Sequence, residues 1–318
     1  MNTNKKFFGV ILAASVVFFW GITFVCTKHL LNEFSSLEIL AIRFIAAYLG
    51  LWVLRPKWEH IPLKDNLWFA LAGLTGVTLY QFAENVAINF TSASNVSVIV
   101  SICPLFTAIV AQIFLKEKHI TPFFILGFVL AITGVALVNF NGRANLQLNP
   151  KGDLLALLAA VCWGFYSMCV SIINKKGFDS ICSTRRVFFF AVILMIPLII
   201  TGTFAPDGSS IKVTWDAAVN AARFSKGINW FNLLFLGLIA SGFCFSAWNK
   251  ACNILGTVKT TAGIYLIPVV TIIVAFIVLD EKITLMGAIG AVITITGLFI
   301  TGITPKKKQE KQDENQNL

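Results

Sequence analysis

The sequence predicts an all-α integral membrane protein in which ten transmembrane helices form two inverted five-helix repeats. Its composition, its long apolar runs and an internal repeat together predict this fold. Hydrophobic residues make up 57% of the 318 positions and charged residues only 13%, and the mean hydropathy is +0.80. One water-soluble core cannot bury so many apolar side chains, so lipid is the expected solvent.

The apolar runs give the expected helices. A membrane-spanning helix needs about 20 mostly apolar residues, and ten runs in the chain are close to that length. These runs cover residues 7–27, 37–54, 67–84, 96–115, 120–140, 154–173, 181–203, 228–248, 262–279 and 283–303. Each run is continuous and does not alternate between apolar and polar residues, as the strands of a transmembrane β-barrel do. The first run is too long for a cleaved signal peptide, so we interpret it as a retained helix.

The basic residues between the runs predict the orientation in the membrane. If the N-terminus is cytoplasmic, most of them fall in cytoplasmic segments: Lys5, Lys6, Arg55, Lys57, Lys64, Lys116, Lys118, Lys175, Lys176, Lys259, Lys306, Lys307, Lys308 and Lys311. The positive-inside rule then predicts that both termini are cytoplasmic, in an inner (plasma) membrane, with a charged cytoplasmic tail at 304–318. This distribution explains the net charge of +10, and we expect membrane lipid, not nucleic acid, as a partner.

The two halves of the chain repeat each other. Trp20-Gly21 recurs 143 positions later as Trp163-Gly164. At an offset of 164, matching residues occur in order: Gly73 with Gly237, Asn85 with Asn249, Ala87 with Ala251, Pro104 with Pro268, Leu115 with Leu279, and Glu117-Lys118 with Glu281-Lys282. The predicted repeats are 7–141 and 150–303. Each has an odd number of helices, so the second is inverted, a plan of secondary transporters that bind substrate near the midplane between the copies.

These motifs give the chain a resemblance to the drug/metabolite transporter superfamily, specifically its EamA type, over residues 8–301. The motifs are the Trp-Gly pair of each first helix, Arg43-Phe44, the segment 91–97 leading to Pro104-Leu105, the Glu after each fourth helix, and the Gly-x6-Gly of each fifth helix. The second repeat departs from the pattern, with Arg186-Val187 in place of Arg-Phe. The resemblance implies a secondary transporter of small metabolites, such as amino acids or drugs, that commonly moves them outward on an ion or substrate gradient.

Polar residues of the third and eighth runs are the first candidates for a substrate site. Glu84 is an acidic residue in or near hydrocarbon, where a carboxylate is costly and usually functional. The alternative is that Glu84 lies at an interface and only caps a helix or pairs with a cation. Tyr80 lies one turn before Glu84, and Asn85 and Asn249 occupy equivalent repeat positions, so these residues are expected to form one polar stripe.

Arg43 and Arg186 also occupy matching repeat positions, early in the second and seventh runs. For both, we favour anchoring at an interface or a buried pairing over contact with substrate.

Hydroxyl residues precede the proline of the fourth and ninth runs. Ser94, Ser97 and Ser101 have helical spacing before Pro104, and Tyr265 lies in the same register before Pro268. A proline frees a backbone carbonyl, which can bind a ligand or let the helix bend. The alternative for the serines is that small residues only permit close helix packing.

Aromatic residues are the third set of candidates. Trp20, Trp163, Tyr166 and Trp248 could form the sides of a midplane cavity for amino acids or aromatic drugs, or could anchor the protein at the membrane interface. Separately, the seven-residue glycine spacing in the fifth and tenth helices predicts a smooth packing face, used within the molecule or in a homodimer.

The sequence does not favour an enzyme. It contains no phosphate-binding Gly-Lys-Ser/Thr loop and no Gly-x-Ser-x-Gly motif, and its histidines and seven cysteines lack metal-ligand spacing. We therefore expect a small-molecule substrate and no cofactor or metal. A membrane-embedded lipid-modifying enzyme is the alternative.

Overall fold

The computed structural model describes residues 3–90, 93–140, 149–279 and 284–301, and these residues form helices and connecting loops without strands. The first half contains α1 (Thr3–Leu30), α2 (Ser36–Leu54), η1 (Leu63–Asp65), α3 (Asn66–Ala72), η2 (Gly73–Leu79), α4 (Tyr80–Phe90), α5 (Ala93–Val100), α6 (Cys103–Phe114) and α7 (Pro122–Phe140). The second half contains α8 (Pro150–Lys175), α9 (Ser180–Thr203), α10 (Ala217–Phe224), α11 (Gly227–Leu234), η3 (Phe235–Phe243), α12 (Cys244–Leu255), α13 (Thr257–Thr261), η4 (Ala262–Leu266), α14 (Ile267–Leu279) and α15 (Leu285–Thr301).

The helices confirm the predicted all-α membrane fold. Among the described residues, six helical stretches are long and apolar enough to cross a membrane: Asn4–Leu30, Ser36–Leu54, Val96–Phe114, Pro150–Lys175, Ser180–Thr203 and Gly227–Leu255. Pro122–Leu137 and Leu285–Thr301 are shorter apolar helices. The third and ninth predicted spans lie in the composite stretches α3–η2–α4 and α13–η4–α14, so the count of ten stays a prediction. The predicted tail, 304–318, lies outside the described residues.

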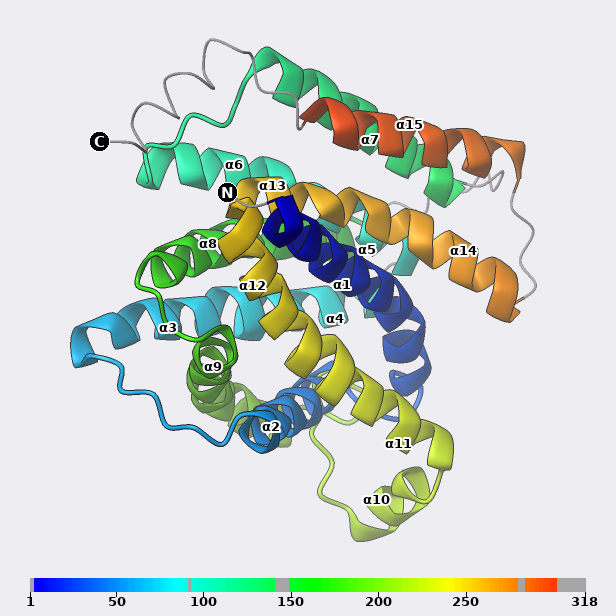
Figure 1. Cartoon of the computed structure of the whole chain (residues 1–318). Helices are drawn as coiled ribbons and strands as arrows, with labels where there is room; N and C mark the ends of the chain where they lie inside the picture. Colours follow the sequence, from blue (N-terminus) through cyan, green and yellow to red (C-terminus); the bar gives the residue numbers. More distant parts are fainter. Residues whose placement is uncertain (1–2, 91–92, 141–148, 280–283, 302–318) are drawn as a thin grey trace.

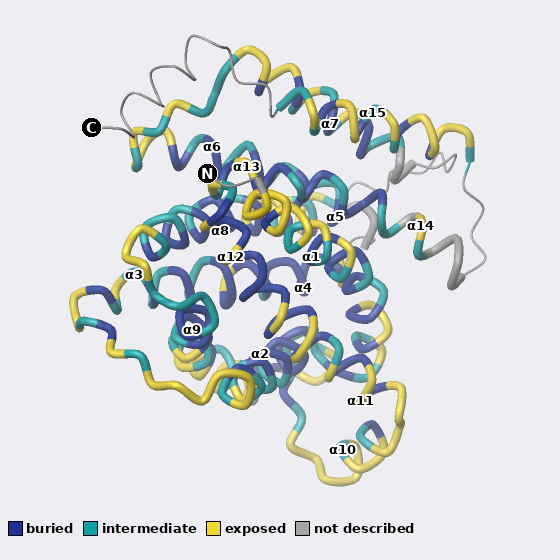
Figure 2. Tube along the Cα trace, viewed as in Figure 1, coloured by how far each residue is buried: buried dark blue, intermediate teal, exposed yellow. Residues whose placement is uncertain are grey.

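The outer surface is apolar, as lipid requires. Large hydrophobic side chains such as Val53, Ile193 and Phe299 are exposed, whereas the buried residues gather where the helices of the two halves meet (Figure 2). A soluble protein rarely exposes contiguous apolar surface of this extent.

Equivalent helices of the two repeats exchange partners (Figure 1). α1 packs on α12 and its equivalent α8 packs on α4, while α2 packs against α9 and α7 against α15. The first helix of each repeat therefore packs against the third helix of the other repeat, so the two repeats interlock.

π-helical turns occur at the same place in both repeats. η2 begins at Gly73, and η3 contains Gly237, the residue that the repeat aligns with Gly73. A Cβ at Gly73 would strike the α9 backbone at Val187 and Ala191, and one at Gly237 would crowd the α2 backbone at Arg43. Small residues at these positions let two helices approach closely, and short π segments are frequently found at functional sites.

The glycines of α7 and α15 pack within the molecule. A Cβ at Gly127 would meet the carbonyl of Gly297, and one at Gly134 would meet the carbonyl of Gly290. Of the two uses considered for this seven-residue spacing, the structure shows the intramolecular one. The glycines allow the two helices to pack closely along their length (Figure 1).

We expect Gly297→Ala to destabilise the protein by about 1–3 kcal/mol, because its Cβ would overlap the backbone of Ala131 and the helices would have to separate. Thermal unfolding in detergent measures the loss. Gly263→Ala is the matched control, since its Cβ would meet only Val17 Cγ2, at an ordinary 3.7 Å. Equal melting temperatures for the two variants would contradict close α7–α15 packing.

α2 and α9 pack against each other, and a buried arginine stabilises the contact at the start of each helix. At the start of α2, Arg223 of α10 donates to both carboxylate oxygens of Glu38 at 2.8 Å and lies over the Phe34 ring at 4.4 Å. At the start of α9, Arg185 donates to the backbone carbonyls of Arg55 and Lys57. The loop after each helix is thus held to the first turn of the other helix.

A second, exposed ion pair lies beside Arg223. Lys226 Nζ is 2.6 Å from Glu33 Oε1, and Asn229 donates to the other carboxylate oxygen. These hydrogen bonds, that from Lys226 first, hold the pKa of the Glu33 carboxyl below its ordinary value. The pair joins the α10–α11 segment to the end of α1. Because it lies at the surface, it contributes little to stability.

Candidate functional site

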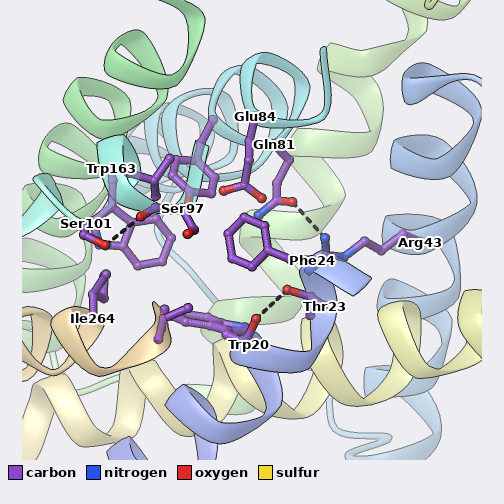
Figure 3. A pocket seen from close by; sticks show the side chains of 13 residues that line it. Trp20, Thr23, Phe24, Arg43, Gln81, Glu84, Ser97, Ser101, Trp163 and Ile264 are labelled. Atoms are coloured by element: carbon purple, nitrogen blue, oxygen red, sulfur yellow. Dashed lines mark hydrogen bonds between the residues drawn. The ribbon is translucent and has the colours of Figure 1, made fainter. Parts of the chain in front are cut away.

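A partly open cavity lies between the two repeats, and about 490 Å³ of space in it and at its opening is not filled by protein atoms. Figure 3 shows side chains from both halves around it. The cavity is lined by Trp20, Thr23, Phe24, Arg43, Tyr80, Gln81, Glu84, Ser97, Val100, Ser101, Trp163, Ile264 and Ile267. The interlocked helices bring these residues together, and a midplane site between inverted repeats is where secondary transporters bind substrate.

The two repeat-related tryptophans form the aromatic side of the cavity. The rings of Trp20 and Trp163 meet edge to face with centroids 5.5 Å apart, and Tyr80 lies 5.0 Å from Trp163. Trp20 is fixed because its indole N–H donates to the carbonyl of Ala240 in η3 at 2.9 Å. The buried Trp163 N–H has no hydrogen-bond partner among the described residues, so a residue lining the cavity retains an unused donor.

Arg43 supplies a buried positive charge. Its Nη1 donates to Gln81 Oε1 at 2.8 Å and its Nε donates to Ser241 Oγ at 2.5 Å, and the residue is only 3% exposed. Both of these acceptors are neutral, so the hydrogen bonds orient the guanidinium without cancelling its charge. Ser241 lies in η3, beside the Ala240 carbonyl that fixes Trp20, so this π segment positions two residues of the cavity.

Glu84 supplies a carboxylate to the same cavity. It is 9% exposed and lies one turn after Tyr80 on α4. Figure 3 shows the Gln81 side chain between Glu84 and Arg43. The cavity therefore carries a basic and an acidic group on one side, both removed from bulk water, where electrostatic interactions are stronger than in solution.

The serine face of the fourth predicted span is broken at the cavity. α5 ends at Val100 and α6 begins at Cys103, with Pro104 in its first turn. Ser97 and Ser101 line the cavity, and the Ser101 hydroxyl donates to the Ser97 carbonyl at 2.6 Å. The Ser94 side chain lies outside the described part of the structure. Proline cannot continue the ladder of hydrogen bonds, which accounts for the break.

The other predicted site residues are buried near the cavity but do not line it. Asn249 accepts a hydrogen bond from the Tyr166 hydroxyl at 3.0 Å and donates to Thr184 Oγ1 at 2.9 Å. Asn85 donates to the carbonyl of Ser36 at 3.4 Å. Tyr166, the donor to Asn249, is itself a predicted site residue. The remaining two are Trp248, whose ring centroid lies 5.0 Å from that of Trp20, and the fully buried Tyr265.

Six predicted residues, Trp20, Tyr80, Glu84, Ser97, Ser101 and Trp163, line the cavity. The sequence analysis did not select Arg43 and Gln81 as substrate contacts. It favoured anchoring at an interface or a buried pairing for Arg43. The structure shows buried hydrogen bonds from Arg43 to Gln81 and Ser241 and also places Arg43 at the cavity. Gln81 precedes Glu84 by three residues, a spacing that puts both on one helix face and that could have identified it.

The sequence comparisons match this chain to transporters. A family model described as the EamA-like transporter family matches residues 7–140 and 150–303. An uncharacterized transporter of Archaeoglobus fulgidus is 27% identical over 304 residues, which cover 94% of this chain and 98% of that protein. A probable amino-acid metabolite efflux pump of Escherichia coli is 29% identical over 298 residues, which cover 91% of this chain and 93% of the pump.

Two further similarities extend this result. A probable terminal-alkyne amino-acid exporter of Streptantibioticus cattleyicolor is 26% identical over 268 residues, which cover 84% of this chain and 81% of the exporter. A protein of known crystal structure with 16% sequence identity superposes with a TM-score of 0.70 and covers 92% of this chain and 96% of its own. At that identity, the structural likeness shows a shared fold alone.

Proposed function

Because this chain belongs to the EamA-like transporter family, whose members are transporters and not enzymes, we propose that it exports small zwitterionic metabolites of the amino-acid class. The proposal places it in an inner (plasma) membrane with both termini cytoplasmic, where the distribution of basic residues predicts them. Transport is driven by an ion or substrate gradient.

The observation that carries the proposal is that Arg43 and Glu84 line one cavity together with Trp20 and Trp163. A carboxylate and an ammonium group on one small molecule match these two charges. An apolar side chain of the substrate fits against the indole rings. Buried charges inside a membrane protein are costly and are retained where they serve a substrate or ion pathway.

Two relatives support the substrate class by their names, since one is a probable amino-acid metabolite efflux pump and another is a probable terminal-alkyne amino-acid exporter. The inverted repeats supply the transport step, because exchanging their conformations opens the cavity to each side in turn. Glu84 is the group proposed to couple this exchange to a proton or another cation. This exchange requires helices to bend. The break between α5 and α6 and the π segments η2 and η3 are the places where these helices bend most easily.

Substrate binding tests the proposal. With purified protein, we expect Arg43→Gln to weaken binding of a labelled aromatic amino acid by about 1.5–3 kcal/mol, the worth of a hydrogen bond to a charged group. The corresponding amine without its carboxylate should bind the parent protein and Arg43→Gln equally. Lys250→Gln removes an exposed positive charge away from the cavity and should change neither affinity.

If Arg43→Gln weakened the amine as much as the amino acid, Arg43 would have a structural role only. Reconstituted vesicles separate the proposal from the alternative of a lipid-modifying enzyme. Labelled amino acid should move across the bilayer chemically unchanged, and modified lipid without solute movement would overturn the assignment.

A further inference from the structure

A second pocket lies where the end of α2 and the loop after it meet the start of α9. About 420 Å³ of space in the pocket and at its opening is not filled by protein atoms. The pocket is lined by Tyr48, Trp52, Trp58, Glu59, Ile61, Cys182, Arg185, Arg186 and Phe189. None of these residues lines the central cavity. We propose that this pocket binds the headgroup of an anionic phospholipid, with an acyl chain lying along the exposed face of α9.

The positive charge of the pocket comes from two consecutive arginines at the start of α9. Arg185 is held in place: it donates to the carbonyls of Arg55 and Lys57 and lies over the Trp52 ring at 3.6 Å. Arg186 donates through Nε and Nη2 to a single neutral atom, Asn66 Oδ1, at 3.1 and 3.0 Å. All of these acceptors are uncharged, so both guanidinium charges remain available to an anion.

Glu59 supplies the one carboxylate among the residues that line the pocket, and this carboxylate binds the backbone. Both oxygens of Glu59 accept the backbone N–H of Asp179, at 3.3 and 3.2 Å, at the residue that caps α9. Two guanidinium groups against one carboxylate leave the pocket net positive. Basic pockets between membrane helices on the cytoplasmic side are suited to anionic headgroups, and the predicted topology places the loop from 55 to 62 on that side.

An apolar track leads away from the pocket. Phe189 lines the pocket and is followed at helical spacing by Ile193, Ile196 and Ile200, and all four are 38–54% exposed. Trp52 and Trp58 also line the pocket, and the centroids of their stacked rings lie 5.8 Å apart. Such aromatic residues are enriched at the level of lipid headgroups. A charged head beside a continuous apolar face matches a lipid, whereas a soluble phosphate or amino acid would leave the apolar track unused.

The test uses the full-length protein in detergent and follows its melting temperature. Dioleoyl phosphatidylglycerol should raise the melting temperature saturably, and dioleoyl phosphatidylcholine at equal concentration should have a much smaller effect. Arg186→Gln should weaken the phosphatidylglycerol response by about tenfold or more in concentration, the effect of losing a charge-assisted contact. Arg186→Lys should retain most of the response because it keeps the charge.

Asn66→Ala separates binding from folding, because it removes the acceptor of Arg186 while leaving both arginines. It should lower the starting melting temperature yet keep the phosphatidylglycerol response. Arg43→Gln, in the central cavity, should leave the response unchanged, so a failure of the transport proposal would not be mistaken for a failure here. The exposed Lys250→Gln is the control for general surface charge.

Three results would overturn the proposal. Glycerol phosphate that reproduced the full effect of phosphatidylglycerol would identify a site for a soluble anion. Competition by a transported amino acid would identify a second substrate site. An equal loss in Arg186→Gln and Lys250→Gln would show attraction to the whole basic surface and no specific pocket.

Discussion

Glu84→Gln is expected to abolish gradient-driven accumulation of substrate while leaving substrate binding and exchange in place. Glutamine keeps the shape and hydrogen bonding of the side chain but removes its titratable charge. One elementary charge moving down 100 mV contributes about 2.3 kcal/mol, so losing one coupled ion should reduce the accumulation ratio by about fiftyfold. The reason to expect this of Glu84 is that it lines the same cavity as Arg43, between the two repeats.

Reconstituted vesicles with an imposed proton gradient measure the loss, and counterflow without a gradient measures the exchange that should remain. Glu59→Gln is the matched control, since that carboxylate lies in the second pocket and outside the cavity. Normal accumulation by Glu84→Gln between about pH 5 and pH 8, where a coupling carboxylate would titrate, would remove Glu84 from the mechanism.

Arg223→Ala is expected to destabilise the protein by about 3–5 kcal/mol, because it leaves the carboxylate of Glu38 buried without its charge partner. The two side chains are 7% and 6% exposed and meet through two hydrogen bonds of 2.8 Å. The Glu38 oxygens also accept the backbone N–H groups of Ser35 and Thr214. Removing the arginine should therefore also loosen α10 and the loop before it.

Thermal unfolding in detergent measures the effect, and hydrogen exchange over residues 204–226 locates it. The double variant Glu38→Ala with Arg223→Ala should lose less than the sum of the single variants, because each single variant leaves one buried charge without its partner and the double variant leaves none. Lys226→Ala, which breaks the exposed pair with Glu33, should have no measurable effect on the melting temperature. A similar small effect for Arg223→Ala would show that the buried pair does not hold the loop.

The sequence by itself determined the class of fold and the family, and it predicted the approximate place of the candidate site. Long apolar runs leave only helices in lipid, because every backbone polar group must find its partner within the segment. The matching of Trp20 with Trp163 revealed the repeat, and the repeat predicted a site between the halves. Glu84 stood out because a carboxylate within an apolar run is costly, and the structure places it at the central cavity.

Only the tertiary structure decided which of the buried polar groups line that cavity. Asn85 and Asn249 are equivalent in sequence, yet neither lines the cavity. Both side-chain groups of Asn249 have partners on other helices, Tyr166 and Thr184, whereas Asn85 donates to Ser36 and its Oδ1 has no partner among the described residues. Arg43 lines the cavity because Gln81 and Ser241, from two different helices, hold its guanidinium there. Helical spacing fixes the face on which a side chain lies, but the helices that meet that face are set by long-range packing, which one sequence does not encode locally.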